Sequence, residues 1–196
     1  CSSLTSITIP ESVTEISVKA FSGCTGLKSV NLTGLDTACV TSMAGMFNNC
    51  AKLETITGYE TWNTGALEDL YMTFNSTSAL KTVDLSLWDL SKLKNSGWCF
   101  QACKASRILL PDNLKVISAG FFNHASNYAG TSFAIPAGVE QIGYAHTFYD
   151  FGTSAFQEFV VAEGNTAFVA IDGILYTADG TKLLAVPRSK TFEKKI

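Results

Sequence analysis

The chain has 196 residues, of which 46% are hydrophobic and 16% are charged, and its formal net charge is −3. That length suffices for a sizeable buried core, and so apolar a composition excludes an intrinsically disordered chain. The 14 lysines and arginines form no dense basic run, so no nucleic-acid partner is expected, and no apolar run approaches the roughly 20 residues of a membrane-spanning helix.

A repeated pattern of 22 to 27 residues organises the chain. The stretches CSSLTSITI, CTGLKSVNL, CAKLETIT and TSALKTVDL share the form C-x-x-L-x-x-I-x-I. A second series precedes the cysteine position by three residues and consists of Phe21, Phe47, Phe74, Phe100, Phe122 and Phe148. A single unit cannot bury its own apolar side, so the repeats are predicted to stack into a solenoid with one continuous core.

Each L-x-x-I-x-I stretch alternates apolar and polar residues, as expected of a short strand with one buried face. In chain order, the predicted strands cover about 5–9, 28–32, 54–57, 81–85, 107–111, 132–136 and 157–161. They are expected to line up as one parallel sheet. The return segments between them are expected to be coil, short strands or short helical turns.

The first residue fits the repeat pattern as well. Cys1 stands three residues before Leu4, as Cys24 stands three before Leu27. We interpret Cys1 as a repeat cysteine without its phenylalanine, so the first repeat is expected to be truncated; a lipid anchor on an N-terminal cysteine is the alternative. An exposed stack end with an unpaired strand edge predicts self-association of the chain there.

The cysteines are predicted to be packing residues. Cys1, Cys24, Cys50 and Cys103 share one repeat position and are expected to form a ladder of small buried thiols, with disulfides between neighbouring repeats as the alternative. Cys99 is assigned to the core, although its spacing from Cys103 could begin a zinc site. No cofactor and no metal ion is expected.

Several segments are similar to a known repeat. ITIPESVTEISVKAFSGCTGLKSV at 7–30 resembles the unit of the BspA-like bacterial leucine-rich repeat family. Looser copies of this unit lie at 109–122 and 134–148. The central segments at 35–47, 62–74 and 88–100 resemble a related variant of the repeat that is found in bacterial surface proteins. The final stretch, NTAFVAIDGILYTADGTKLLAVP at 165–187, is similar to a hairpin that follows the repeats in this family.

The resemblance implies a mainly β leucine-rich repeat solenoid with a parallel sheet on one face and a C-terminal β-hairpin over about 166–186. Residues 1–164 are assigned to about seven repeats, and residues 165–196 to the hairpin cap and the start of a following segment, within one domain. The resemblance also implies a secreted or cell-surface location and brings no catalytic residues. Some similar proteins are adhesins that bind host or bacterial partners.

Two further sets of residues recur at fixed repeat positions. Asp36, Asn63 and Asp89 form a stacked row that is interpreted as turn capping after each strand. Trp62 and Trp88 are interpreted as packing residues, with an aromatic shelf for a ligand as the alternative.

The outward strand face is the usual binding surface of a solenoid. Its predicted ligand row consists of Thr8, Asn31, Thr57, Asp84, Leu109, Ala134 and Val160. The row changes from polar to apolar along the stack, which predicts a mildly hydrophobic patch in the C-terminal half. A neighbouring row contains Lys28, Glu54 and Lys81, whose alternating charges can pair across strands.

Together these features predict a non-enzymatic binding or adhesion module of a bacterial surface or secreted protein. Its partner would be a protein or glycan recognised over the strand face, such as a component of a host surface or matrix. An architectural spacer with no ligand of its own is the alternative. An enzyme is not expected, because no nucleophile, metal or phosphate-binding motif is recognisable.

Overall fold

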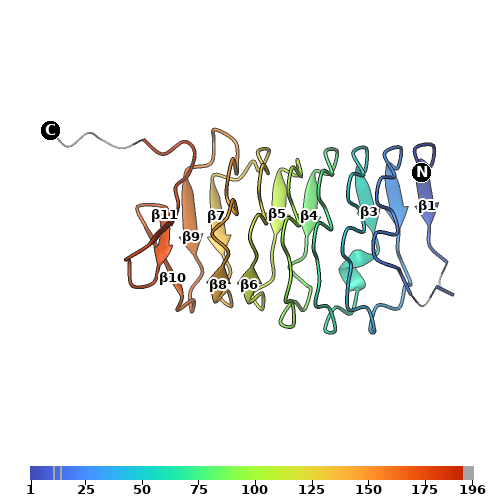
Figure 1. The fold of residues 1–196 in the computed structure, drawn as a ribbon, viewed down its shortest axis with the longest axis horizontal. Coiled ribbons are helices and arrows are strands. Elements are labelled where there is room, and N and C mark those ends of the chain that lie inside the picture. The colour runs from blue at the N-terminus through green and yellow to red at the C-terminus, as the bar shows by residue number, and fades with distance from the viewer. Residues whose placement is uncertain (11, 14, 192–196) are drawn as a thin grey trace.

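The computed structural model describes residues 1–10, 12–13 and 15–191 and is a parallel β-solenoid of about six turns. Figure 1 shows the rungs, each one turn of the solenoid, stacked along the long axis from β1 to the C-terminal sheet. The strands are β1 (Ser6–Thr8), β2 (Ser29–Asn31), β3 (Thr55–Thr57), β4 (Thr82–Asp84), β5 (Arg107–Leu109), β6 (Val116–Ile117), β7 (Ser132–Ile135), β8 (Gln141–Ile142), β9 (Glu158–Val161), β10 (Phe168–Ile171), β11 (Ile174–Thr177) and β12 (Leu183–Ala185). The 3₁₀ helix η1 (Tyr59–Thr61) lies between β3 and β4.

The predicted strand positions are confirmed, because β1, β2, β3, β4, β5, β7 and β9 all fall within the expected ranges. These strands share one side of the solenoid, but their hydrogen bonds do not run through it as a single sheet. Parallel ladders join β1–β2–β3, β4–β5 and β7–β9, with no ladder between β3 and β4 or between β5 and β7 in the described chain. The short strands β6 and β8 pair with each other in the return segments.

A tyrosine hydroxyl replaces a ladder bond at each interruption. The Asp84 N–H at the first break donates to the hydroxyl of Tyr59, at 3.2 Å. At the second break the hydroxyl of Tyr128 donates to the carbonyl of Ser132, at 2.9 Å. Burial raises the pKa of both tyrosines, so both hydroxyls stay protonated and able to donate at neutral pH.

The return side, opposite the strands, holds the rungs together by a regular hydrogen-bond ladder. From the rung of Phe21 to that of Phe122, the core phenylalanine and the residues two before and two after it donate their N–H groups to carbonyls of the next rung, as Phe21 does to Met46 at 3.0 Å. The flanking residues all have positive φ, and they are Lys19, Gly23, Gly45, Asn49, Met72, Ser76, Trp98, Ala102, Gly120, His124, His146 and Asp150. A left-handed conformation costs a non-glycine residue about 1–2 kcal/mol, and the inter-rung bonds of this turn offset that cost.

The predicted phenylalanine series forms a continuous column through the core. Rings of neighbouring rungs lie 5.3 to 5.9 Å apart between centroids and are close to parallel. The repeat leucines Leu27, Leu53 and Leu80 are buried beside this column. In the next rung Ala105 is buried while Ser106 is exposed, so Ala105 takes the position of the repeat leucine.

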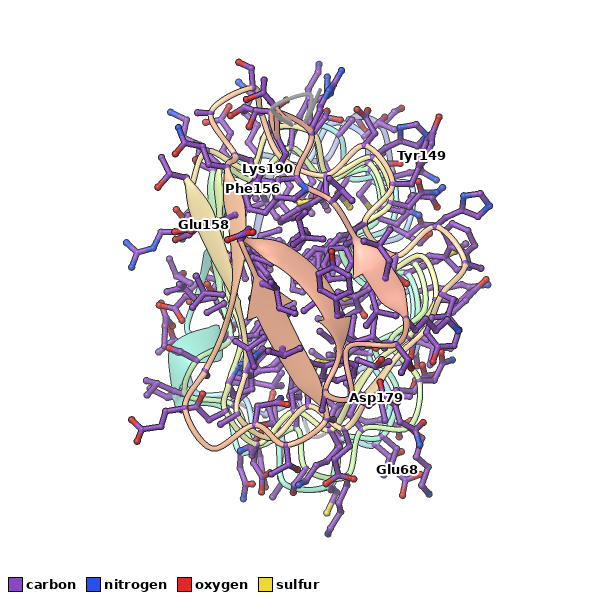
Figure 2. The ribbon with its side chains drawn as sticks, turned by 90° about the vertical axis from the view of Figure 1, so that its left-hand side faces the viewer. Glu68, Tyr149, Phe156, Glu158, Asp179 and Lys190 are labelled. Atoms are coloured by element: carbon purple, nitrogen blue, oxygen red, sulfur yellow. The ribbon has the colours of Figure 1, made fainter. Side chains whose placement is uncertain are left out.

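The predicted C-terminal hairpin is confirmed and carries a third strand. Strands β10, β11 and β12 form an antiparallel sheet that lies across the end of the stack, as Figure 2 shows. Phe168, Leu175 and Ala185 point into the core and close it. The turn between β10 and β11 is Asp172-Gly173, both with positive φ, as a two-residue hairpin turn requires.

The cysteines are free thiols. All six belong to the described residues and none of them forms a disulfide; Cys24, Cys50, Cys99 and Cys103 are buried, whereas Cys1 and Cys39 are exposed. The predicted buried ladder is therefore correct except for Cys1, which lies at the exposed end of the stack. Burial raises the pKa of Cys50 to about 11, so its thiol is protonated and unreactive near pH 8.

We expect iodoacetamide at pH 8 to alkylate Cys1 and Cys39 in the folded protein and to spare the four buried cysteines. Intact-mass spectrometry should then show two adducts under native conditions and six in denaturant without reductant. Rapid alkylation of Cys50 in the folded state would contradict its burial, and fewer than six adducts after unfolding would reveal a disulfide.

Candidate functional site

The predicted ligand row lies on the strand face, and none of its seven members is buried. The strand registers align Thr8 with Asn31 and Thr57, Asp84 with Leu109, and Ala134 with Val160. The residues are therefore neighbours within each ladder, but the two interruptions divide the row into three parts. That this row binds a ligand stays a prediction.

Two polar members of the row are occupied by local bonds. Asn31 accepts the Thr33 N–H at 3.0 Å through its side-chain oxygen. Asp84 accepts both the N–H and the hydroxyl of Ser86, at 3.0 and 2.6 Å. These side chains cap the turns that follow β2 and β4, which leaves them less free to select a ligand than the sequence pattern suggested.

The break between β3 and β4 leaves backbone groups of both strands without ladder partners. Thr55 donates to the Lys28 carbonyl and Thr57 accepts from Leu32, so both residues bond toward β2. Bonding alternates along a strand, and Ile56 therefore turns its N–H and C=O toward β4. By the same argument Thr82 turns its N–H and C=O toward β3, because its neighbours bond toward β5.

A one-residue insertion accounts for this break. Five positions separate Thr57 from Trp62, whereas the equivalent step from Asp84 to Trp88 is four. The extra residue is accommodated by η1, which follows Gly58 with φ of 86°. A Cβ on Gly58 would lie 2.3 Å from the Thr33 nitrogen, so no larger residue fits at this position.

Gly58 stands at the position of the buried Leu32 of the preceding rung, and the Tyr59 ring that follows it packs against the core. The Tyr59 ring meets Trp88 edge-on, with centroids 6.2 Å apart, and its carbonyl accepts the indole N–H of Trp88 at 3.1 Å. Its hydroxyl reaches Asp84, as described above. The ring therefore stands between β3 and β4 at one end of the gap and holds the two strands apart.

A cleft of about 260 Å³ opens in the strand face at this gap. Strands β3 and β4 form its walls, Tyr59 closes one end, and Phe74 and Leu80 form its floor. Figure 1 shows the wider separation of β3 and β4 compared with β1, β2 and β3. The return side of these two rungs stays closed, with Phe47 N–H bonded to the Thr73 carbonyl at 3.0 Å, so the cleft is a wedge that opens toward solvent.

Opposite charges stand at the mouth of this cleft. Glu54 lies on the β3 side and Lys81 on the β4 side, and both side chains are exposed. The predicted cross-strand pairing of the charged row is not seen, because neither Lys28 nor Lys81 is within ion-pair distance of Glu54 in the described structure. Both charges at the cleft are thus available to a ligand.

A second, broader depression of about 480 Å³ lies between β9 and β10 at the C-terminal end of the strand face. Val160 of the predicted row lines it together with Phe168 and Val169. Of the predicted apolar part of the row, only Val160 lines this depression, so a hydrophobic patch in the C-terminal half stays a prediction.

Other residues singled out in the sequence have structural roles. Asp36, Asn63 and Asp89 each accept the backbone N–H two residues ahead, which confirms them as turn caps. Trp62 and Trp88 stack on each other in the core and are buried, so the alternative of an aromatic ligand shelf is wrong.

The possible zinc site at Cys99 and Cys103 has no support in the described part of the chain, where no group of three His, Cys, Asp or Glu residues could hold a metal ion. Within the same residues, no helix has the length and apolar character that a membrane crossing requires.

Short parallel strands on one side, a buried leucine at the repeat position of successive rungs (Leu27, Leu53 and Leu80) and a tight return turn define a leucine-rich repeat protein. The chain belongs to the BspA-type leucine-rich repeat family, whose repeat region matches it in six copies over residues 1–128 and 70–168. Among functionally curated proteins, none matches the chain significantly in sequence.

Solved structures of bacterial proteins are similar to this one. A leucine-rich cell surface protein from Faecalibacterium prausnitzii is 27% identical with a TM-score of 0.66, over 94% of this chain and 46% of its own. The pneumococcal vaccine antigen PcpA is 22% identical with a TM-score of 0.44, over 96% of this chain and 38% of its own. A leucine-rich repeat protein of T. pallidum is 20% identical with a TM-score of 0.36, over 80% of this chain and 58% of its own. The chain spans between 38% and 58% of the length of these proteins.

The interruption predicts a specific pattern of amide protection. We expect the Ile56 and Thr82 amides, which face the cleft, to exchange about 100-fold faster than the Thr55 and Arg107 amides, which are bonded within ladders. Hydrogen exchange followed residue by residue by NMR measures this difference. Equal protection of all four amides would mean that β3 and β4 are joined by a ladder in solution.

Proposed function

We propose that this chain is a non-enzymatic binding module of a bacterial surface or secreted protein, and that it contacts a protein or glycan partner through its strand face. Membership of the BspA-type family supports this proposal, as does the 27% identity to a protein described as a leucine-rich cell surface protein. A surface or extracellular location is part of the same proposal.

The observation that carries the proposal is the accessibility of the strand face. The row from Thr8 to Val160 is nowhere buried, and the strand face contains two hollows, at β3–β4 and at β9–β10. The apolar end of the row adds contact area that a partner can bury, since Val160 is 40% exposed. A long, shallow, mixed surface of this kind suits a macromolecule better than a small substrate.

The test is an array of matrix proteins, mucins and glycans probed with the intact chain and with a Leu109→Asp/Val160→Asp variant. Both changes put a carboxylate on the apolar part of the row, where desolvation on binding is costly, so affinity for a true partner should fall at least about tenfold. Saturation binding of the hits by surface plasmon resonance measures the change.

The matched control is Val18→Asp, which makes the same substitution at an exposed position on the return segment of the first rung. It should leave binding unchanged, and thermal melting should be similar for all three proteins. Saturable binding that survives the double substitution would refute the strand face as the binding surface. An array with no saturable hit would favour a spacer that only separates other parts of a longer protein.

The predicted self-association at the first rung stays a proposal as well. Within the described residues strand β1 pairs only with β2, which supports this proposal for the chain studied alone.

A further inference from the structure

We propose that the β3–β4 cleft docks an extended segment of a partner protein, which pairs with the free edge of β3 as a short additional strand. This inference rests on the proposed function and deepens it, because it names the class of partner and one place on the strand face where that partner binds.

Both walls of the cleft carry backbone N–H and C=O groups without ladder partners. Ile56 on one wall and Thr82 on the other each present an N–H and a C=O that no ladder uses. The pairing pattern also leaves the Glu54 carbonyl without its usual partner, because no bond joins it to β4. An alternating row of donors and acceptors along a strand edge is the template that main-chain amides complete when a peptide adds to a sheet.

The size of the cleft also fits a short extended peptide. The cleft measures about 260 Å³, slightly below the roughly 300 Å³ at which small-molecule pockets begin. It runs along only the first part of β3 and β4, because the Tyr59 ring closes it where Asp84 bonds to the hydroxyl. Its lining on β3 runs only from Glu54 to Ile56, and a strand rises about 3.3 Å per residue, so the backbone of two or three extended residues matches it.

The floor of the cleft is apolar, and its mouth carries one charge of each sign. Leu80 and Phe74 offer an apolar floor in contact with the core column, which suits one small apolar side chain of the partner. Glu54 and Lys81 at the mouth favour a basic and an acidic residue on either side of it. Successive side chains of a strand point to opposite faces, so one inward residue between outward neighbours fits this arrangement.

The gap is built into the free protein, so docking requires little rearrangement. Tyr59 lies between the strands, where its hydroxyl accepts the Asp84 N–H and its carbonyl accepts the indole N–H of Trp88. The hydrogen bonds of the return side keep the two rungs in register. A peptide therefore meets an edge that is already exposed, and it displaces water from groups that have no protein partner.

The experiment selects peptides from a displayed library of random heptapeptides on the intact chain and measures the affinity of the selected peptides for two variants. Thr82→Trp fills the cleft from its β4 wall. Ser6→Trp places the same bulk at the equivalent exposed position of β1, outside the cleft, and serves as the control. Affinity should fall at least tenfold for Thr82→Trp and stay within twofold for Ser6→Trp, with similar thermal melting.

A second readout distinguishes strand addition from other peptide binding. N-methylation of each amide of a selected peptide in turn should weaken binding at least tenfold at the two or three residues that lie in the cleft, because their amides face β3 or β4, and should leave the flanking positions unchanged. Amide shifts in NMR spectra of the chain should be largest at Ile56 and Thr82.

Three results would overturn the inference: a library that yields no saturable binder, equal affinity of selected peptides for the Thr82→Trp variant, or uniform effects of N-methylation. A glycan that loses its binding in Thr82→Trp would also overturn it, by assigning the cleft to a sugar. The outcome that would refute the peptide site differs from the outcome that would refute the strand face as a binding surface. A partner lost in Leu109→Asp/Val160→Asp but retained by Thr82→Trp would leave the strand face as a binding surface and remove only the peptide site.

Discussion

The structure depends on the hydrogen-bond ladder of its return side. In five successive rungs, those of Phe21, Phe47, Phe74, Phe100 and Phe122, the phenylalanine lies between two left-handed residues, and this turn directs three N–H groups at the carbonyls of the next rung. The rungs are thereby held at a constant spacing, which brings the phenylalanine rings into one stacked column. With the return side fixed in this way, the strand side can lose its ladder locally while the stack stays intact.

The cleft follows from that division of roles. At β3–β4 the return side is bonded normally, whereas the strand side is separated by a tyrosine that arrives with one additional residue. The free edges that result would threaten aggregation in an open sheet. Here they are short and recessed between neighbouring rungs, so a partner has to present a narrow, extended segment to reach them. Charged residues at the mouth restrict the choice further.

Much of the architecture could be predicted from the sequence, because it is encoded by repetition. The strand centres and the phenylalanine column follow from residues that recur at matching positions, whereas the final hairpin follows from the family resemblance of residues 165–187. The left-handed turns could not be foreseen, since Met72, Trp98 and Ala102 carry no intrinsic preference for positive φ and are held there by inter-rung bonds. Ala105 in place of a leucine could be assigned only once its burial was known.

The candidate site was predicted less well, because it arises from a departure from the repeat. The outward row was placed correctly on the strand face, but the cleft depends on Gly58 and Tyr59, where the rung is one residue longer than its neighbour. That difference in spacing was the available signal. Its consequence depends on the three-dimensional position of the Tyr59 hydroxyl, which the pattern does not contain.

The most direct measurement is a through-hydrogen-bond NMR coupling experiment on the intact chain, labelled with ¹⁵N and ¹³C. The account predicts a coupling between the Thr55 amide and the Lys28 carbonyl across β2–β3, and none between the Thr82 amide and the Glu54 carbonyl across β3–β4. A coupling of ordinary size between Thr82 and Glu54 would mean that the strand face is one continuous sheet. The cleft and the peptide site argued from it would then not exist.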